Sequence, residues 1–176
     1  AGLRRFVLEH TEAARLRRAI VAPSAVHRNG REYGGWFSHL STTNATQHTE
    51  NLHYVLSKFK EVKLIFSIDG VGKTNDYLRY PSNWADIENN VKKFKNLTNA
   101  THQISFTVQN LNLLDIVNII RFSNKNKIHL KLNLLFGPGY LQLHVLTKKL
   151  LRKALGNLET VNHADIIHVT NFNEIK

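Results

Sequence analysis

The chain has 176 residues, a formal net charge of +11, and no cysteine or methionine. This length suits one domain with a real hydrophobic core. The missing cysteine excludes a disulfide framework, a thiolate metal site and a cysteine nucleophile in the chain as written. No apolar run approaches the roughly 20 residues that cross a bilayer, and the start of the chain lacks the apolar region of a secretory signal. We therefore expect a cytoplasmic protein.

Composition divides the chain near residue 36. Residues 1–36 contain seven Arg, no Lys and one Asn, whereas residues 37–176 contain 14 Lys, three Arg and 18 Asn. Coding sequences rich in GC and in AT would give these two amino-acid compositions. We therefore predict that residues 1–36 form an Arg/Ala-rich segment of different origin. The alternative is a sampling fluctuation in composition. Residues 3–21 predict a basic amphipathic helix, either a packing helix with a solvated face or an arm that contacts nucleic acid or a membrane.

Residues 37–176 alternate between strand and helix patterns. Short apolar runs and period-two alternation predict strands, and apolar residues at helical spacing predict helices. The predicted strands are 39–43, 62–68, 103–109, 128–136 and 165–170, with a brief further alternation at 141–145. Helices are predicted around 52–59, after Asn83, after Asn112 and from Thr147 through Leu155, where Gly156 is the expected stop. Repeated βα units predict an α/β fold, either a partial (β/α) barrel or an open parallel sheet of about four to five strands with flanking helices.

The stretch from residue 62 to residue 81 carries the strongest functional signal. An apolar run of strand length breaks at Gly70 and Gly72, and polar residues follow at once. In α/β sheets, ligands bind at the carboxyl ends of the strands, so we expect a site here. The candidate site residues in this stretch are Ser67, Asp69, Asn75, Asp76 and Arg79.

A phosphate-binding P-loop is the alternative interpretation of the same stretch. Gly72-Lys73-Thr74 matches the last three positions of that motif. However, the motif needs a glycine five residues before Gly72, where this chain has Ser67, and Asp69 would repel phosphate. We therefore prefer an ordinary strand-to-loop turn.

The order of short motifs along the chain resembles that of radical S-adenosylmethionine enzymes, in particular the subgroup with a C-terminal twitch extension. The resemblance spans about residues 41–158. The residues that carry it are Thr42-Thr43-Asn44, Ser67-Ile68-Asp69-Gly70, Asn75 through Pro81, Trp84, Thr107-Val108-Gln109 with Asn112, Gly137 through Leu141, and Val145-Leu146.

The resemblance implies a partial (β/α)6 barrel that binds S-adenosylmethionine on a [4Fe–4S] cluster and generates a 5′-deoxyadenosyl radical, often acting on a peptide. It implies that Asn44 lies beside the cofactor and that Ser67 and Asp69 line its ribose and carboxylate. Arg79 would pair with the methionyl carboxylate. The interpretation requires Ser67, Asp69 and Arg79 to face one another, and this segment not to form a helix.

The chain departs from the family in the part that makes the radical. The family's Cys-x3-Cys-x2-Cys loop is absent, since the chain has no cysteine. The Gly-Gly-Glu-Pro motif is also missing, with Gly34-Gly35-Trp36-Phe37 at best its remnant. We therefore expect a remnant or fragment of the C-terminal half of such an enzyme, unable to form the radical as written.

A second hypothesis is a basic, non-enzymatic binding or structural protein. It would contact nucleic acid through the Arg-rich N-terminus, or a protein partner; for the scattered Lys residues we prefer a solvated surface to a nucleic-acid groove. A metal-dependent hydrolase has little support, because His163 and His168 are five apart and no H-E-x-x-H motif occurs.

Overall fold

A computed structural model of the chain describes residues 38–162, 166 and 169–170. Its strands are β1 (Ser38–Thr43), β2 (Glu61–Ser67), β3 (Ala100–Val108), β4 (His129–Leu134) and β5 (Val169–Thr170). Its α-helices are α2 (Glu50–Ser57), α3 (Lys73–Leu78), α4 (Trp84–Phe94), α5 (Ile116–Asn126) and α6 (Lys148–Glu159). Its 3-10 turns are η3 (Leu113–Asp115), η4 (Gly139–Leu141) and η5 (Leu143–Val145). The predicted 1–36 segment and its helix lie outside the described residues.

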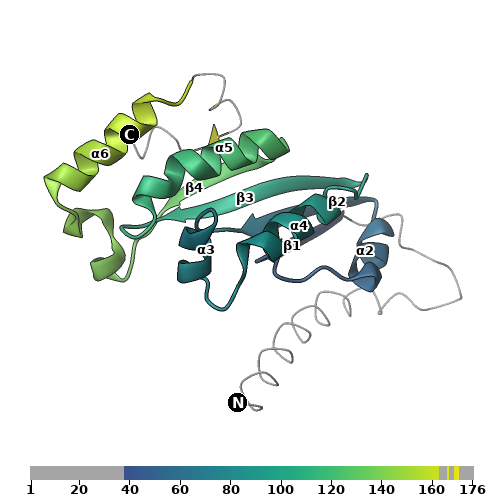
Figure 1. Ribbon diagram of the computed structural model, residues 1–176. Helices are drawn as coiled ribbons and strands as arrows, with labels where there is room; N and C mark the ends of the chain where they lie inside the picture. The colour runs from purple at the N-terminus through teal and green to yellow at the C-terminus, as the bar shows by residue number, and fades with distance from the viewer. Residues whose placement is uncertain (1–37, 163–165, 167–168, 171–176) are drawn as a thin grey trace, which may run out of the picture. The chain divides into compact units, whose positions relative to one another are not determined.

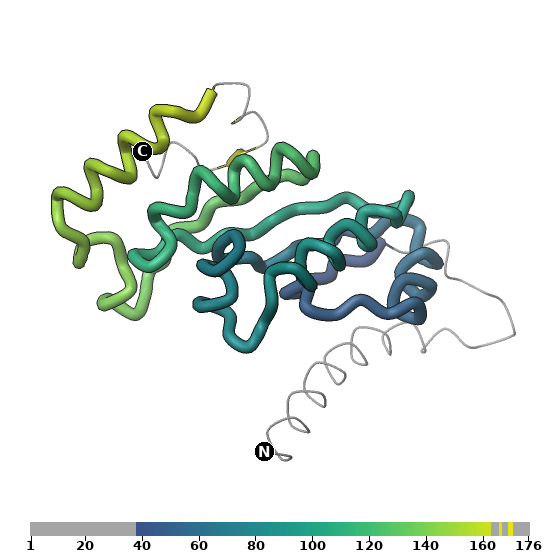
Figure 2. Tube along the Cα trace, in the orientation of Figure 1, coloured from purple at the N-terminus to yellow at the C-terminus, as the bar shows by residue number. Residues whose placement is uncertain are grey.

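The five strands form one parallel sheet in the order β1-β2-β3-β4-β5. Figure 2 shows this order as a steady change of colour across the sheet, from blue through teal to green. Because right-handed crossovers join neighbouring strands in sequence, the connecting helices pack on one side, and Figure 1 shows α4 and α5 there together. The expected α/β fold is confirmed, with the sequential strand order of a partial barrel.

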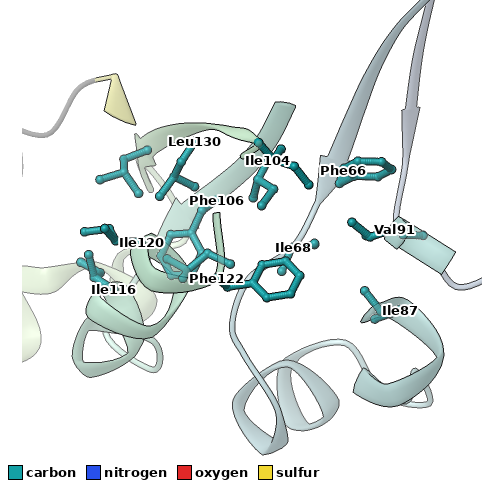
Figure 3. Close-up of a cluster of buried hydrophobic side chains, with 14 of the residues drawn as sticks. Phe66, Ile68, Ile87, Val91, Ile104, Phe106, Ile116, Ile120, Phe122 and Leu130 are labelled. Atoms are coloured by element: carbon teal, nitrogen blue, oxygen red, sulfur yellow. The ribbon is translucent and has the colours of Figure 1, made fainter. Parts of the chain in front are cut away.

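The hydrophobic core lies between the sheet and the helices. On the covered face, β2, β3 and β4 contribute alternate residues that are fully buried, among them Phe66, Ile104, Phe106 and Leu130. Figure 3 shows these side chains facing those of α4 and α5, such as Ile87 and Ile120. Burial of this apolar area supplies the main stabilising free energy of the fold.

The opposite face of the sheet is mostly polar, although it also carries Leu40 and Ile65. Lys63 on β2 and Lys131 on β4 are exposed, and Gln103 on β3, which pairs in register with His129, is partly buried. The strands therefore alternate between an apolar face against the helices and a mostly polar face. In open parallel sheets, ligands bind outside the carboxyl ends of the strands, and this is where the chain after β2 leaves the sheet.

Helix starts were predicted well where a capping side chain precedes an apolar stripe. The Asn83 side chain accepts a hydrogen bond from the Ala85 N–H (2.8 Å), and the Thr147 hydroxyl accepts one from the Leu150 N–H (3.4 Å). Trp84, the first residue of α4, packs edge-on against Phe122 at 4.9 Å between ring centroids.

One prediction about the C-terminal part was wrong. Gly156 does not stop α6, which continues to Glu159 because Leu158 is buried and packing outweighs the weak helix propensity of glycine. The brief alternation at 141–145 falls in the two 3-10 turns η4 and η5. This segment is held by the loop after β3, since the Asn110 N–H donates to the carbonyl oxygen of Leu141 (2.9 Å).

Helix α3 was not predicted. Lys73–Leu78 has no apolar stripe at helical spacing, so its pattern gave no signal. The condition that residues 62–81 contain no helix is therefore not met at Lys73–Leu78, although residues 61–67 do form a strand. The helix has a specific consequence for the site, because it turns the chain between Asp69 and Arg79.

Candidate functional site

The candidate site begins where β2 ends. Asp69 lies two residues past Ser67, the last residue of β2, where the chain leaves the sheet. The Ile68 N–H donates to the carbonyl oxygen of Ser105 (3.2 Å), and the next β3 amide, that of Thr107, donates to Asp69 Oδ1 (3.2 Å). The Asp69 carboxylate thus adds one further hydrogen bond at the end of the β2–β3 ladder.

Arg79 completes the contact from the far end of α3. Its Nε donates to Asp69 Oδ2 at 2.9 Å, and its Nη2 lies 2.7 Å from the same oxygen. The side chains are 28% exposed for Arg79 and 16% exposed for Asp69, so this ion pair is partly screened from solvent. A guanidinium has five N–H donors, so three remain beyond those that Asp69 receives.

Gly70 and Gly72 allow α3 to fold against the end of the strand. A Cβ on Gly70 would lie 2.7 Å from Thr74 Cγ2 and 2.9 Å from the Asn75 backbone nitrogen. Gly72 has a φ of +59°, in the left-handed region that glycine adopts without strain. The space beside Gly70 is filled by α3 itself, and Lys73 is exposed. These contacts favour the strand-to-helix turn over a phosphate cradle.

Ser67 and Asn44 lie at the same level of the sheet on neighbouring strands. Thr43, the last residue of β1, pairs with Phe66, so Asn44 follows it at the level of Ser67. The Asn44 Oδ1 accepts hydrogen bonds from the Thr46 N–H (3.2 Å) and hydroxyl (2.8 Å). The side-chain oxygen of Asn44 is therefore used within a local turn, and its proposed role beside a cofactor stays a prediction.

Asn75 and Asp76 serve α3 and α4. Asn75 is fully buried, with Nδ2 3.4 Å from the Ser82 hydroxyl. The Asp76 Oδ1 accepts a hydrogen bond from the Trp84 N–H at 2.6 Å, at the start of α4. The structure therefore brings Asp69 and Arg79 together with Ser67 nearby, and gives Asp76 a capping role.

Sequence reasoning missed a group of polar residues contributed by the chain after β3. Asn112 was predicted as a helix N-cap, but its side chain makes no capping hydrogen bond. Instead its Nδ2 donates to the carbonyl oxygen of Asp69 (3.0 Å). Asp115, three residues later, accepts a hydrogen bond from the Val71 N–H at 2.6 Å. The Asn-x-x-Asp spacing of Asn112 and Asp115 is visible in the sequence. Their role becomes clear only in the structure, where both side chains bind the loop after β2.

Asp115 lies in an apolar setting that disfavours its charge. Burial raises the pKa of the Asp115 carboxyl above its usual value, and hydrogen bonds from Asn118 and the Val71 N–H offset part of this effect. Asn118 Nδ2 donates to Asp115 Oδ1 at 2.7 Å. Each oxygen of the Asp115 carboxylate therefore accepts a single hydrogen bond, which compensates only part of the cost of burying the charge.

Within the residues that the structure describes, no three His, Asp or Glu side chains converge in a way that could hold a metal ion. His163 and His168 fall outside that part of the chain. None of the helices in the described segments combines the length and the apolar character needed to cross a bilayer.

No protein-family model matches the chain, and no curated protein matches it. A solved structure similar to this chain is the crystal structure of Streptococcus suis SuiB bound to S-adenosylmethionine, with a TM-score of 0.48 and 18% sequence identity. The similarity covers 68% of this chain and 27% of the SuiB chain. This chain therefore spans about a quarter of the length of that solved chain. The contacts of Asp69 and Arg79 described above do not depend on this similarity.

Proposed function

We propose that residues 37–176 are a remnant or fragment of a radical S-adenosylmethionine-type barrel, in which Arg79, oriented by Asp69, binds the carboxylate of an S-adenosyl ligand. The observation that carries the proposal is the placement of Arg79, held by Asp69 at the carboxyl end of a parallel sheet. A guanidinium oriented in this way can make two parallel hydrogen bonds to a second carboxylate.

The two parts of the implied cofactor fit this chain differently. A [4Fe–4S] cluster does not fit, because cluster ligation needs thiolates and the chain has no cysteine. The methionyl carboxylate does fit, since Arg79 keeps three N–H donors and is partly exposed. The proposal is therefore binding of an S-adenosyl ligand without radical chemistry.

Replacement of Arg79 tests this proposal directly. We expect wild-type protein to bind S-adenosylmethionine in isothermal titration calorimetry, and Arg79→Gln to raise the Kd about tenfold or more. A hydrogen bond to a charged group contributes about 1.5–3 kcal/mol, and 1.4 kcal/mol corresponds to a factor of ten. Arg121→Gln on α5, where the side chain is exposed, is the matched control and should leave the Kd unchanged.

A ligand that lacks the carboxylate separates this role from general damage. 5′-Deoxy-5′-methylthioadenosine keeps the nucleoside but has no carboxylate, so its Kd should be the same for wild type and Arg79→Gln. An equal loss of affinity for both ligands would show that the substitution disturbs the site as a whole. Absence of S-adenosylmethionine binding to wild type would refute the proposal.

Binding to nucleic acid or to a protein partner is the alternative proposal. Two exposed cations, Lys63 and Lys131, lie on the polar face of the sheet and support it. Binding of a single-stranded oligonucleotide that weakens steeply with rising salt would favour this alternative.

Two finer assignments are proposals that the resemblance alone supports. One is a peptide or protein substrate. The other is membership of the twitch-containing subgroup.

A further inference from the structure

The turn that follows β3 contacts the loop after β2 through two buried polar side chains. Asn112 is 1% exposed, and its Nδ2 donates to the carbonyl oxygens of Asp69 (3.0 Å) and Thr107 (2.9 Å). Its Oδ1 accepts a hydrogen bond from the Gln109 N–H at 2.8 Å. The side-chain amide of Asn112 therefore links the backbone after β2, at Asp69, to the backbone at the end of β3, at Thr107 and Gln109.

Asp115 makes the second contact, one turn further on. It is 8% exposed, and its Oδ2 accepts a hydrogen bond from the Val71 N–H at 2.6 Å. Its other oxygen accepts the hydrogen bond from Asn118. Burying a carboxylate with so few donors is costly, so a neutral apolar residue would be the more stabilising choice if packing were the only requirement.

The loop of residues 69–72, which these two side chains bind, has a sequence that allows many backbone conformations. Residues 69–72 include two glycines, which allow more backbone conformations than any other residue. Three groups fix the loop from outside: Asn112 binds the Asp69 carbonyl, the Thr107 N–H binds the Asp69 carboxylate, and Asp115 binds the Val71 N–H. All three come from β3 or the turn after it.

We propose that Asn112 and Asp115 are positioning residues that fix the loop of residues 69–71 and thereby the direction of the Asp69 carboxylate and the Arg79 guanidinium. This inference rests on the proposed function in one respect, since it takes Arg79 to be the group that meets a ligand. The order of the loop itself is measurable without any ligand.

Amide hydrogen exchange of the full chain, followed residue by residue with NMR, tests the inference. In Asn112→Ala and Asp115→Ala, the Val71 amide should exchange about tenfold faster relative to the β4 amides than it does in wild type. Asp115→Asn should keep wild-type protection of Val71, because its amide oxygen can still accept that hydrogen bond.

Asn126→Ala is the matched control. Asn126 is also buried, and its Nδ2 donates to the carbonyl oxygen of Phe122 at 2.8 Å, at the other end of α5. This variant should lower global stability without changing exchange at Val71 relative to β4. The inference is wrong if all three alanine variants change the Val71 ratio equally, or if none of them changes it.

The Kd for S-adenosylmethionine provides a second test of the positioning role. We expect Asn112→Ala to raise the Kd as Arg79→Gln does, and Asn126→Ala to leave it unchanged. If wild type binds no S-adenosylmethionine, the proposed function fails, while the exchange ratios still decide whether Asn112 and Asp115 order the loop.

Discussion

Asp115 combines burial, a negative charge and a contact with the backbone of the site loop. Its carboxyl has a pKa raised by burial, so the native state binds this proton more readily than the unfolded state does. The contribution of Asp115 to stability is therefore fully present below the ordinary pKa near 3.8, and it is lost as the pH rises through the raised value. At neutral pH the ionised carboxylate is kept at a cost in stability.

Asp115→Asn should remove this cost while its one side-chain oxygen still accepts from the Val71 N–H; the Asn118 side-chain amide must then rotate so that its oxygen accepts from the new NH2 group. We expect its free energy of unfolding at pH 7 to equal or exceed that of wild type, whereas Asp115→Ala should lose about 1–3 kcal/mol because the Val71 N–H is left without a partner. Urea denaturation at pH 4, 5 and 7 measures both effects. The advantage of Asp115→Asn over wild type should grow with pH; a constant difference would contradict the assignment.

At the residue scale, the sequence predicted that Asp69 and Arg79 lie together but did not predict their other contacts. Asp69 and Arg79 were predicted as candidate site residues because polar residues follow an apolar strand. In the structure the two side chains form an ion pair. The partners supplied by Thr107, Asn112 and Asp115 were not predicted, because they depend on the register between β2 and β3. A period-two pattern shows which face a residue occupies but not which residue lies beside it.

Among the helices, α5 ends in a conformation that its sequence does not favour. Lys127 follows the last helical residue, Asn126, with a φ of +52°, in the left-handed region. The Lys127 N–H donates to the Asn124 carbonyl oxygen at 3.0 Å, so the position acts as the C-terminal cap. Glycine is the residue that usually occupies this position.

Lys127→Gly should therefore raise the free energy of unfolding by about 1 kcal/mol, because an L-residue in the left-handed region costs about 1–2 kcal/mol. Thermal or urea unfolding measures the change. Lys125→Gly, in the last turn of the same helix, is the control and should lower stability by about 0.5–1 kcal/mol. A loss of stability in Lys127→Gly would show that its side chain contributes more than its backbone conformation costs.

The elements themselves were largely predictable where hydrophobic periodicity is strong. The first four strands and four of the helices, α2, α4, α5 and α6, follow the pattern of apolar residues. Helix α3 and the turns η4 and η5 were missed, because they are fixed by long-range contacts rather than by an apolar stripe. Short elements without a buried face carry little signal in the sequence.

For the molecule as a whole, three partly buried histidines link stability to pH. Burial lowers the pKa of His39, His48 and His102 from the usual 6.5, and the nearby His53 lowers that of His48 further. The native state therefore binds fewer protons at these sites than the unfolded state. Their contribution to stability is present above pH 6.5 and is lost as the pH falls below it.

We expect the Tm to fall between pH 7.5 and pH 5.5, and His102→Gln to reduce that fall. His102 Nε2 lies 3.0 Å from the Phe94 carbonyl oxygen, and a glutamine amide can donate to the same group. His144→Gln, at an exposed position, is the control and should leave the pH dependence unchanged. Identical pH profiles for wild type and His102→Gln would contradict this assignment.

The hydrogen bond from the Thr107 N–H to the Asp69 carboxylate has a consequence for how this sheet can change. In a regular ladder each rung joins two peptide groups, which every residue except proline supplies whatever its side chain. Here the last rung depends on which amino acid the gene encodes at position 69. Replacing Asp69 with a residue whose side chain has no acceptor oxygen would remove this hydrogen bond, so the end of the β2–β3 pairing depends on one side chain as well as on the backbone.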